Sequence, residues 1–157
     1  ILDRLDPVRI VVVSSAPQIR YPDCYGIDMA KMGDFIAFQA AIAIHKKRGN
    51  EALIEGVYKA CKAELEKPFS EQRNMVKPIY ENLTPEETSN QISALLTPDN
   101  MKAEVRIIYQ SVEGLHAAIP EHKGDWYFTG DFPTPGGNRV VNRAFVFWKD
   151  GRTDRAY

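Results

Sequence analysis

The chain has 157 residues, enough for one domain with a sizeable core, and its 44% hydrophobic and 26% charged residues are ordinary for a globular protein. Twenty basic and twenty-one acidic side chains give a formal net charge of -1, which argues against a dedicated nucleic-acid-binding protein. Two cysteines are too few for a disulfide framework, and the apolar runs are too short to span a membrane. We expect a cytoplasmic protein without a signal peptide, without nucleic acid and without a membrane partner.

The first residues predict the end of a helix followed by a buried strand. Residues 1–5 (Ile-Leu-Asp-Arg-Leu) carry apolar residues at helical spacing and no methionine, which is typical of a helix whose beginning is missing. Arg9–Ser14 is a β-branched run without polar alternation. Such a run favours a central strand of a parallel sheet, buried on both faces. Pro17 ends regular pairing, and an ordered loop over 18–29 follows.

The next segment predicts a helical hairpin. A helix over 31–48 has apolar residues at spacings of three and four, and Gly49 is a suitable cap for its C-terminal end. Asn50 can cap a second helix, which Pro68 stops.

Beyond Pro68, residues that end helices and strands alternate with short stretches of periodic hydrophobic residues. Residues 68–83 are polar and predict a loose connection, whereas Thr84, followed by Pro-Glu-Glu, predicts a helix start with a capping box. A strand over 105–109 and a short helix over 111–118 come next. The Pro-Thr-Pro-Gly-Gly run at 133–137 either closes a hairpin or belongs to a tail pinned to a partner.

Two stretches carry longer sequence patterns. The first is Val-Val-Val-Ser-Ser-Ala-Pro-Gln-Ile-Arg-Tyr-Pro-Asp-Cys-Tyr-Gly-Ile-Asp-Met at 11–29. The second combines Ser-Val-Glu-Gly-Leu at 111–115 with Tyr-Phe-Thr-Gly-Asp-Phe-Pro-Thr at 127–134. The first resembles the segment just after the phosphoribosyl-pyrophosphate loop of amidophosphoribosyltransferases, the enzymes that begin purine synthesis. The second is similar to the C-terminal end of the same family.

The resemblance implies an α/β fold, in which the chain forms part of a phosphoribosyltransferase-like parallel sheet with helices. It divides the chain into the C-terminal part of that domain at 1–46, a helical insertion at 47–103, and a strand, a helix and an aromatic-rich tail at 104–157. The parent enzyme would transfer ammonia from glutamine onto the sugar pyrophosphate, with magnesium. Its implied partners are phosphorylated small molecules and the missing N-terminal part of the same chain.

Several features of the family are missing from this sequence. The chain has neither the N-terminal cysteine that hydrolyses glutamine nor the Asp-Asp-Ser and Gly-Thr-Thr loop that binds the sugar pyrophosphate. Some members hold an iron–sulfur cluster, but Asp23 stands where one cysteine ligand would be, and Cys24 is one place late. We therefore predict no iron–sulfur cluster, no cofactor bound by this chain itself and no catalysis by the chain alone.

The loop after the first strand supplies the candidate ligand-binding residues. Ligands of open parallel sheets bind beyond the carboxyl ends of the strands, where this loop would lie. Arg20 could pair with a phosphate or carboxylate, Tyr25 could cover an apolar ligand face, and Asp28 could hold a cationic group. Alternatively, Arg20 pairs with Asp23, and Asp28 only orders the turn.

Other readings of the sequence stay open. The spacing of His45, His116 and His122 suits neither a metal site nor a nucleophile–base pair. The inserted helices could form a regulatory domain that binds a nucleotide or a partner subunit. The aromatic segment 126–148 could instead bury against another chain as an assembly surface, and we expect a homo-oligomer.

Overall fold

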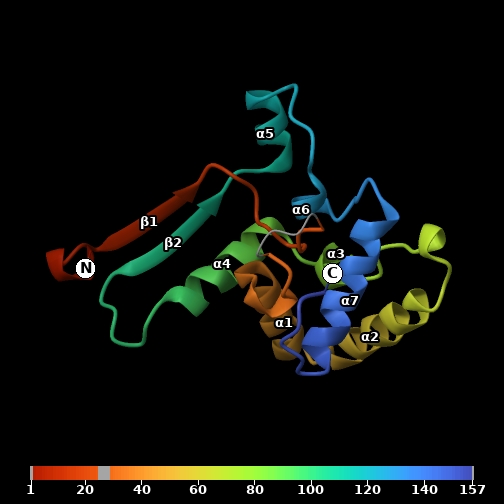
Figure 1. Ribbon diagram of the computed structural model, residues 1–157. Helices are drawn as coiled ribbons and strands as arrows, with labels where there is room; N and C mark the ends of the chain where they lie inside the picture. The colour runs from red at the N-terminus through yellow and green to blue at the C-terminus, as the bar shows by residue number, and fades with distance from the viewer. Residues whose placement is uncertain (1, 25–28, 157) are drawn as a thin grey trace.

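A computed structural model describes residues 2–24 and 29–156, and it is mixed α/β (Figure 1). Strands β1 (Arg9–Ser14) and β2 (Glu104–Tyr109) pair in parallel, with Arg9 opposite Glu104 and Ser14 opposite Tyr109. The α-helices are α1 (Ile36–Lys47), α2 (Glu51–Leu65), α3 (Pro78–Glu81), α4 (Pro85–Leu96), α5 (Val112–Ala118), α6 (Trp126–Thr129) and α7 (Pro135–Lys149). Three short 3-10 helices are η1 (Leu2–Leu5), η2 (Met32–Asp34) and η3 (Phe69–Glu71).

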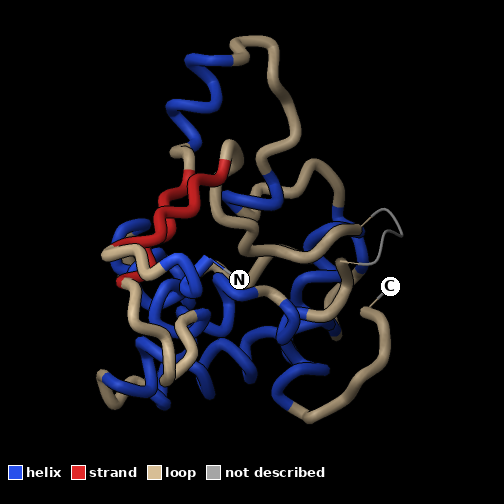
Figure 2. Tube along the Cα trace, turned by 90° about the vertical axis from the view of Figure 1, so that its left-hand side faces the viewer, coloured by secondary structure: helices blue, strands red, loops and turns tan. Residues whose placement is uncertain are grey.

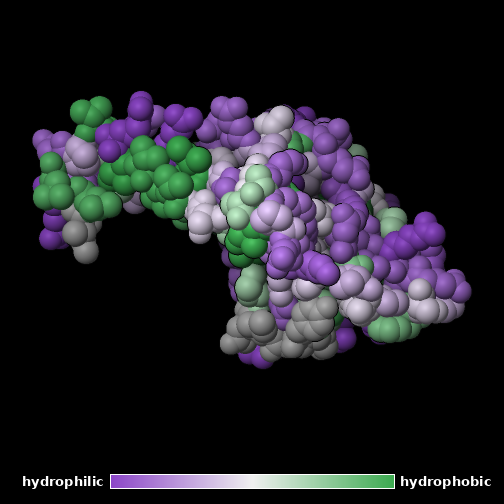
Figure 3. Space-filling model, turned by 90° about the horizontal axis from the view of Figure 1, so that it is seen from above, coloured by the Kyte–Doolittle hydropathy of each residue, from purple (hydrophilic) through white to green (hydrophobic). Residues whose placement is uncertain are grey.

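The parallel pairing of the two strands agrees with the α/β fold class, but the burial predicted for β1 is wrong. Val13 is 70% exposed, and Val11 and Val12 are each 48% exposed. In the described part of the chain, β1 has a neighbour on one edge only, because the sheet holds two strands. Helices α1 and α4 cover the side of β2 on which Ile107 packs with Ile92. The paired strands project from the helices as an arm, and hydrophobic residues gather along one side of it (Figures 1 and 3).

The helical hairpin is confirmed, with small changes at its ends. Helix α1 begins at Ile36, later than predicted, because η2 precedes it and Phe35 has extended backbone angles. Gly49 has a φ of 69°, which is the left-handed conformation expected of a C-terminal cap. Asn50 precedes α2 as predicted, but its side chain makes no capping hydrogen bond.

The predicted start of α4 at Thr84 and Pro85 is confirmed. The backbone N–H of Glu87 donates a 3.1 Å hydrogen bond to the hydroxyl of Thr84, and Pro85 is the first helical residue. The carboxylate of Glu87 pairs with Arg48 of the helical hairpin. Helix α4 is thereby tied to α1 as well as to β2.

The prediction of a loose connection over 68–83 is wrong. This segment forms η3 and α3, and Val76 and Ile79 lie in the core. Its polar residues serve the fold, because the buried amide of Gln72 donates hydrogen bonds to the carbonyls of Leu65 and Lys67. The buried Gln72 therefore contributes internal hydrogen bonds, while other polar residues of the segment, such as Ser70 and Glu71, are exposed.

The hairpin considered at 133–137 is also wrong, because this run begins α7. Thr134 accepts a hydrogen bond from the backbone N–H of Gly137, as an N-terminal cap does. A Cβ atom on Gly137 would lie 2.2 Å from Cδ1 of Phe132, so the glycine allows that ring to pack against the helix. The buried residues of α7 recur at helical spacing, and Val141 and Phe145 are fully buried.

One hydrophobic cluster draws on all three segments into which the sequence was divided. Phe38 of α1, Cys61 of α2, Ile79 of α3 and Phe145 of α7 all belong to it. The rings of Phe38 and Phe145 meet edge to face, with centroids 5.9 Å apart. Within the described ranges, no helix combines the length and the apolar character needed to cross a membrane.

Candidate functional site

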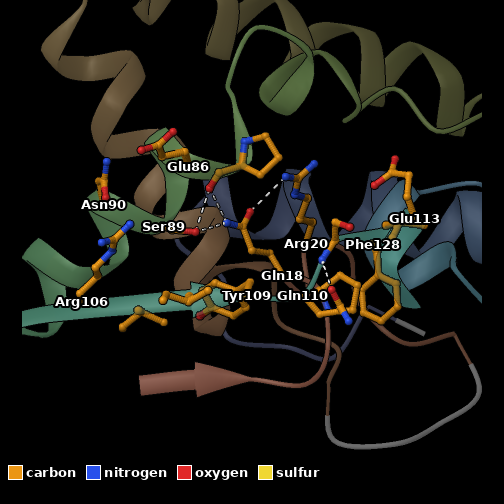
Figure 4. A pocket seen from close by; sticks show the side chains of 16 residues that line it. Gln18, Arg20, Glu86, Ser89, Asn90, Arg106, Tyr109, Gln110, Glu113 and Phe128 are labelled. Atoms are coloured by element: carbon orange, nitrogen blue, oxygen red, sulfur yellow. Dashed lines mark hydrogen bonds between the residues drawn. The ribbon is translucent and has the colours of Figure 1, made fainter. Parts of the chain in front are cut away.

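A cavity of about 400 Å³ lies where β2 and the loop after β1 meet helix α4 (Figure 4). Its walls are Pro17, Gln18 and Arg20 of that loop, the first two turns of α4, residues 106–109 of β2, the start of α5, and Phe128. The cavity is therefore near the carboxyl ends of both strands, where ligands of parallel sheets bind. Its volume is within the range of small-molecule sites.

Arg20 is the predicted ligand-binding residue that the structure brings to this cavity. Its Nη2 donates a 3.0 Å hydrogen bond to Oε1 of Gln18, and its guanidinium lies 5.4 Å from the centre of the Tyr80 ring. The Tyr80 hydroxyl in turn donates to the Arg20 carbonyl at 2.8 Å. The Nε atom is buried and has no hydrogen-bond partner among the described residues. Arg20 thus keeps donor capacity for a ligand.

Gln18 connects Arg20 to α4. The amide nitrogen of Gln18 donates to the carbonyl of Pro85 at 2.8 Å and to the hydroxyl of Ser89 at 2.9 Å. Gln18 and Ser89 are both buried, and Figure 4 shows the Gln18 amide between Ser89 and Arg20. These hydrogen bonds from Gln18 to Pro85 and Ser89, which we call the Gln18 relay, orient the amide so that its oxygen faces the Arg20 guanidinium.

Three other charged residues line the cavity. Arg106, Glu86 and Glu113 are all exposed, and none of them is ion-paired within the described ranges. Solvent screens the charges of these three exposed residues. The partly buried Arg20 therefore makes the largest contribution to the electrostatic potential inside the cavity. The two glutamates add hydrogen-bond acceptors at its edge.

The alternative in which Arg20 pairs with Asp23 does not occur. Asp23 is fully buried and accepts a 2.6 Å hydrogen bond from the hydroxyl of Tyr127. Burial and this bond to the carboxylate raise the pKa of Tyr127 to about 12. The other two candidates, Tyr25 and Asp28, lie outside the described residues.

The two stretches with a family resemblance are in direct contact. The carbonyl of Tyr127 accepts hydrogen bonds from the backbone N–H groups of Arg20, at 2.8 Å, and Tyr21, at 3.1 Å. The ring of Tyr21 also meets that of Phe132 edge to face, at 6.5 Å between centroids. Sequence reasoning identified both stretches but did not predict these contacts.

Sequence reasoning also missed a cluster formed by α5 and the residues before α6. Asp125 contacts Nε2 of His116 at 2.6 Å and Nε2 of His122 at 2.8 Å. The signal was present in the sequence as two histidines and an aspartate within ten residues, but only the tertiary turn after α5 brings them together. Across the described ranges, no group of histidine, cysteine, aspartate or glutamate side chains is arranged to hold a metal ion.

Comparison of the chain with protein-family models, with curated protein sequences and with solved structures gave no match.

Proposed function

We propose that the chain is the C-terminal portion of an amidophosphoribosyltransferase-like enzyme of purine biosynthesis. In this proposal the parent enzyme forms phosphoribosylamine from glutamine and the sugar pyrophosphate. The present chain walls the acceptor or nucleotide side of that site and is not catalytic alone. The missing N-terminal part of the same chain would supply the glutaminase, the pyrophosphate loop and the magnesium ligands.

The observation that carries the proposal is the contact between the two family-like stretches. They are about a hundred positions apart in the sequence, yet Tyr127 accepts hydrogen bonds from Arg20 and Tyr21. Strand β1, which overlaps the first stretch, also pairs in parallel with β2, which directly precedes the second. Two unrelated local similarities would have no reason to meet in one fold, whereas two parts of one family pattern would.

The exposed arm supports the same proposal. An isolated two-stranded parallel sheet is rare, because parallel strands normally have both faces covered. The valines of β1 are exposed on the faces of the arm, and the free backbone edge of β1 could accept another strand. In this proposal the N-terminal part of the chain supplies further strands at that edge and helices that cover the faces of the sheet, and with them the valines.

The test is to sequence the gene upstream of Ile1 and to assay the full-length product. An Asp-Asp-Ser loop followed by Gly-Thr-Thr, with glutamine-dependent formation of phosphoribosylamine, is the expected result. An Arg20→Ala variant of that product should bind substrate or nucleotide more weakly. Absence of both the loop and the activity would overturn the proposal.

A regulatory function is the second candidate, because helix α4 of the inserted segment forms one wall of the cavity. Deleting the insertion cannot test this, since Cys61 and Ile79 belong to the core and their loss would unfold the protein. A point substitution in the cavity of the full-length enzyme is the better test. Loss of feedback inhibition with retained catalysis would favour regulation over a catalytic role for the cavity.

A further inference from the structure

We propose that the cavity between α4 and β2 binds a small anionic metabolite that also carries hydroxyl groups, with Arg20 as the anchor of the anion. The inference comes from the geometry of the cavity and does not require the chain to be part of a phosphoribosyltransferase. It gives the inserted segment a specific role, because α4 supplies one wall of the site.

Arg20 has hydrogen-bond donors that no described residue uses. A guanidinium has five N–H donors, and the described contacts of Arg20 use one of them, toward Gln18. The buried Nε is left without a hydrogen-bond partner in the described part of the chain. The remaining N–H groups of the two Nη atoms are not used in the described contacts, and they can form charge-assisted hydrogen bonds with an anion.

Neighbouring side chains hold Arg20 in one position. Gln18 is buried and is fixed by Pro85 and Ser89, and its oxygen holds one end of the guanidinium. The Tyr80 ring lies 5.4 Å from the guanidinium carbon and the Tyr80 hydroxyl holds the Arg20 carbonyl. Since these contacts restrict Arg20 before a ligand arrives, binding loses little side-chain entropy.

The remaining lining explains the choice of ligand. Glu86 and Glu113 carry no ion pair within the described residues, and they can accept hydrogen bonds from ligand hydroxyl groups. Arg106 adds a second guanidinium, while Ile107 and Phe128 provide apolar surface. A bare inorganic anion would use only the arginines, so a hydroxylated anion should bind more tightly.

The test uses titration calorimetry with three probes: glycerol 3-phosphate, malate and inorganic phosphate. Glycerol 3-phosphate and malate share hydroxyl groups and differ in the anion, so their relative affinities distinguish a phosphate anchor from a carboxylate anchor. We expect at least one of them to bind more tightly than inorganic phosphate. Lack of binding by all three at about 10 mM would overturn the proposal.

Two variants locate the binding. Arg20→Met keeps the apolar stem but removes the guanidinium, and we expect it to weaken binding at least about tenfold. Asn90→Trp places a large ring at an exposed position of the α4 wall without touching the Gln18 relay, and it should block binding even if Arg20→Met folds poorly. Arg139→Met is the matched control, because Arg139 is an exposed arginine of α7 outside the cavity. Wild-type affinity in Asn90→Trp, or an equal loss in Arg139→Met, would refute this site.

Discussion

The hydroxyl of Tyr127 donates a 2.6 Å hydrogen bond to the fully buried carboxylate of Asp23, across 104 positions of the chain. The bond joins the loop after β1 to helix α6, and therefore one family-like stretch to the other. A buried carboxylate depends on such donors, because its desolvation is otherwise uncompensated. The bond is also the simplest point at which to test the fold.

We expect Tyr127→Phe to lower the free energy of unfolding by about 2 kcal/mol, since it removes a hydrogen bond to a buried charged group. The measurement is urea denaturation followed by circular dichroism. Tyr58→Phe is the matched control, because the Tyr58 hydroxyl donates to the exposed carboxylate of Asp150. Tyr58→Phe should cost less, and an equal or larger loss there would contradict the structural importance of the Tyr127 contact.

The sequence predicted those parts of the fold that depend on local signals. The Thr84 cap and the Gly49 turn are encoded within a few residues, and the structure has both. The start of α7 was missed, because Gly137 suggested a turn and its helical role depends on the packing of Phe132. The exposure of β1 was also missed, since a strand's hydrophobic pattern reflects all its neighbours in a complete sheet.

The candidate site was also predictable only in part, because contacts between distant segments leave no signal in the local sequence. Arg20 could be proposed from its place after a parallel strand, which is a rule of topology. The contact between Gln18 and Ser89, 71 positions apart, could not be proposed, because nothing in either local sequence signals it. The link between Asp125 and two histidines likewise depends on the path of the chain after α5.

A substitution at Gly130 would test how closely the second family-like stretch packs against the first. It has a φ of 74°, and a Cβ atom there would lie 2.5 Å from Nδ2 of Asn74 and 2.7 Å from Cζ of Tyr21. We expect Gly130→Ala to destabilise the protein by more than the approximately 1–2 kcal/mol that the left-handed conformation alone costs. Thermal unfolding of the variant measures the effect.

Gly151→Ala is the control for Gly130→Ala. Gly151 has a similar φ of 69°, but a Cβ atom there would meet nothing within 4 Å. The difference between the two variants therefore isolates the steric contribution of Tyr21 and Asn74. Equal destabilisation in both would mean that the packing around Gly130 is looser than the structure indicates.

Cys61 should be inert to thiol reagents in the folded protein. Its side chain is fully buried, and burial, with a smaller effect of Glu64, raises the pKa of the thiol to about 12. Because the thiolate is the reactive form, both access and ionisation oppose modification. In a Cys24→Ser variant, Ellman's reagent should detect this thiol only after denaturant is added. Rapid reaction without denaturant would contradict the placement of Cys61 in the core.

Glu64 should make stability depend on pH. Its side chain is 4% exposed; burial alone would raise its pKa, but the Lys67 ammonium at 2.7 Å and the backbone N–H of Arg73 at 2.8 Å hold the pKa below its ordinary value of 4.5. A carboxyl group with a lowered pKa in the folded state stabilises that state when it is ionised. The stabilisation is complete above the ordinary pKa and is lost as the pH falls through the lower pKa of the folded state.

We therefore expect the difference in unfolding free energy between wild type and Glu64→Gln to shrink on acidification from about pH 6 to about pH 3. Urea denaturation at several pH values measures this difference. Glu55→Gln is the control, since Glu55 is more exposed and lies 3.5 Å from Lys149 at the surface. Its effect should be small and should vary less with pH, because solvent screens that pair. A difference for Glu64→Gln that stays constant over this range would mean that Glu64 is not held as an ionised group by Lys67 and Arg73.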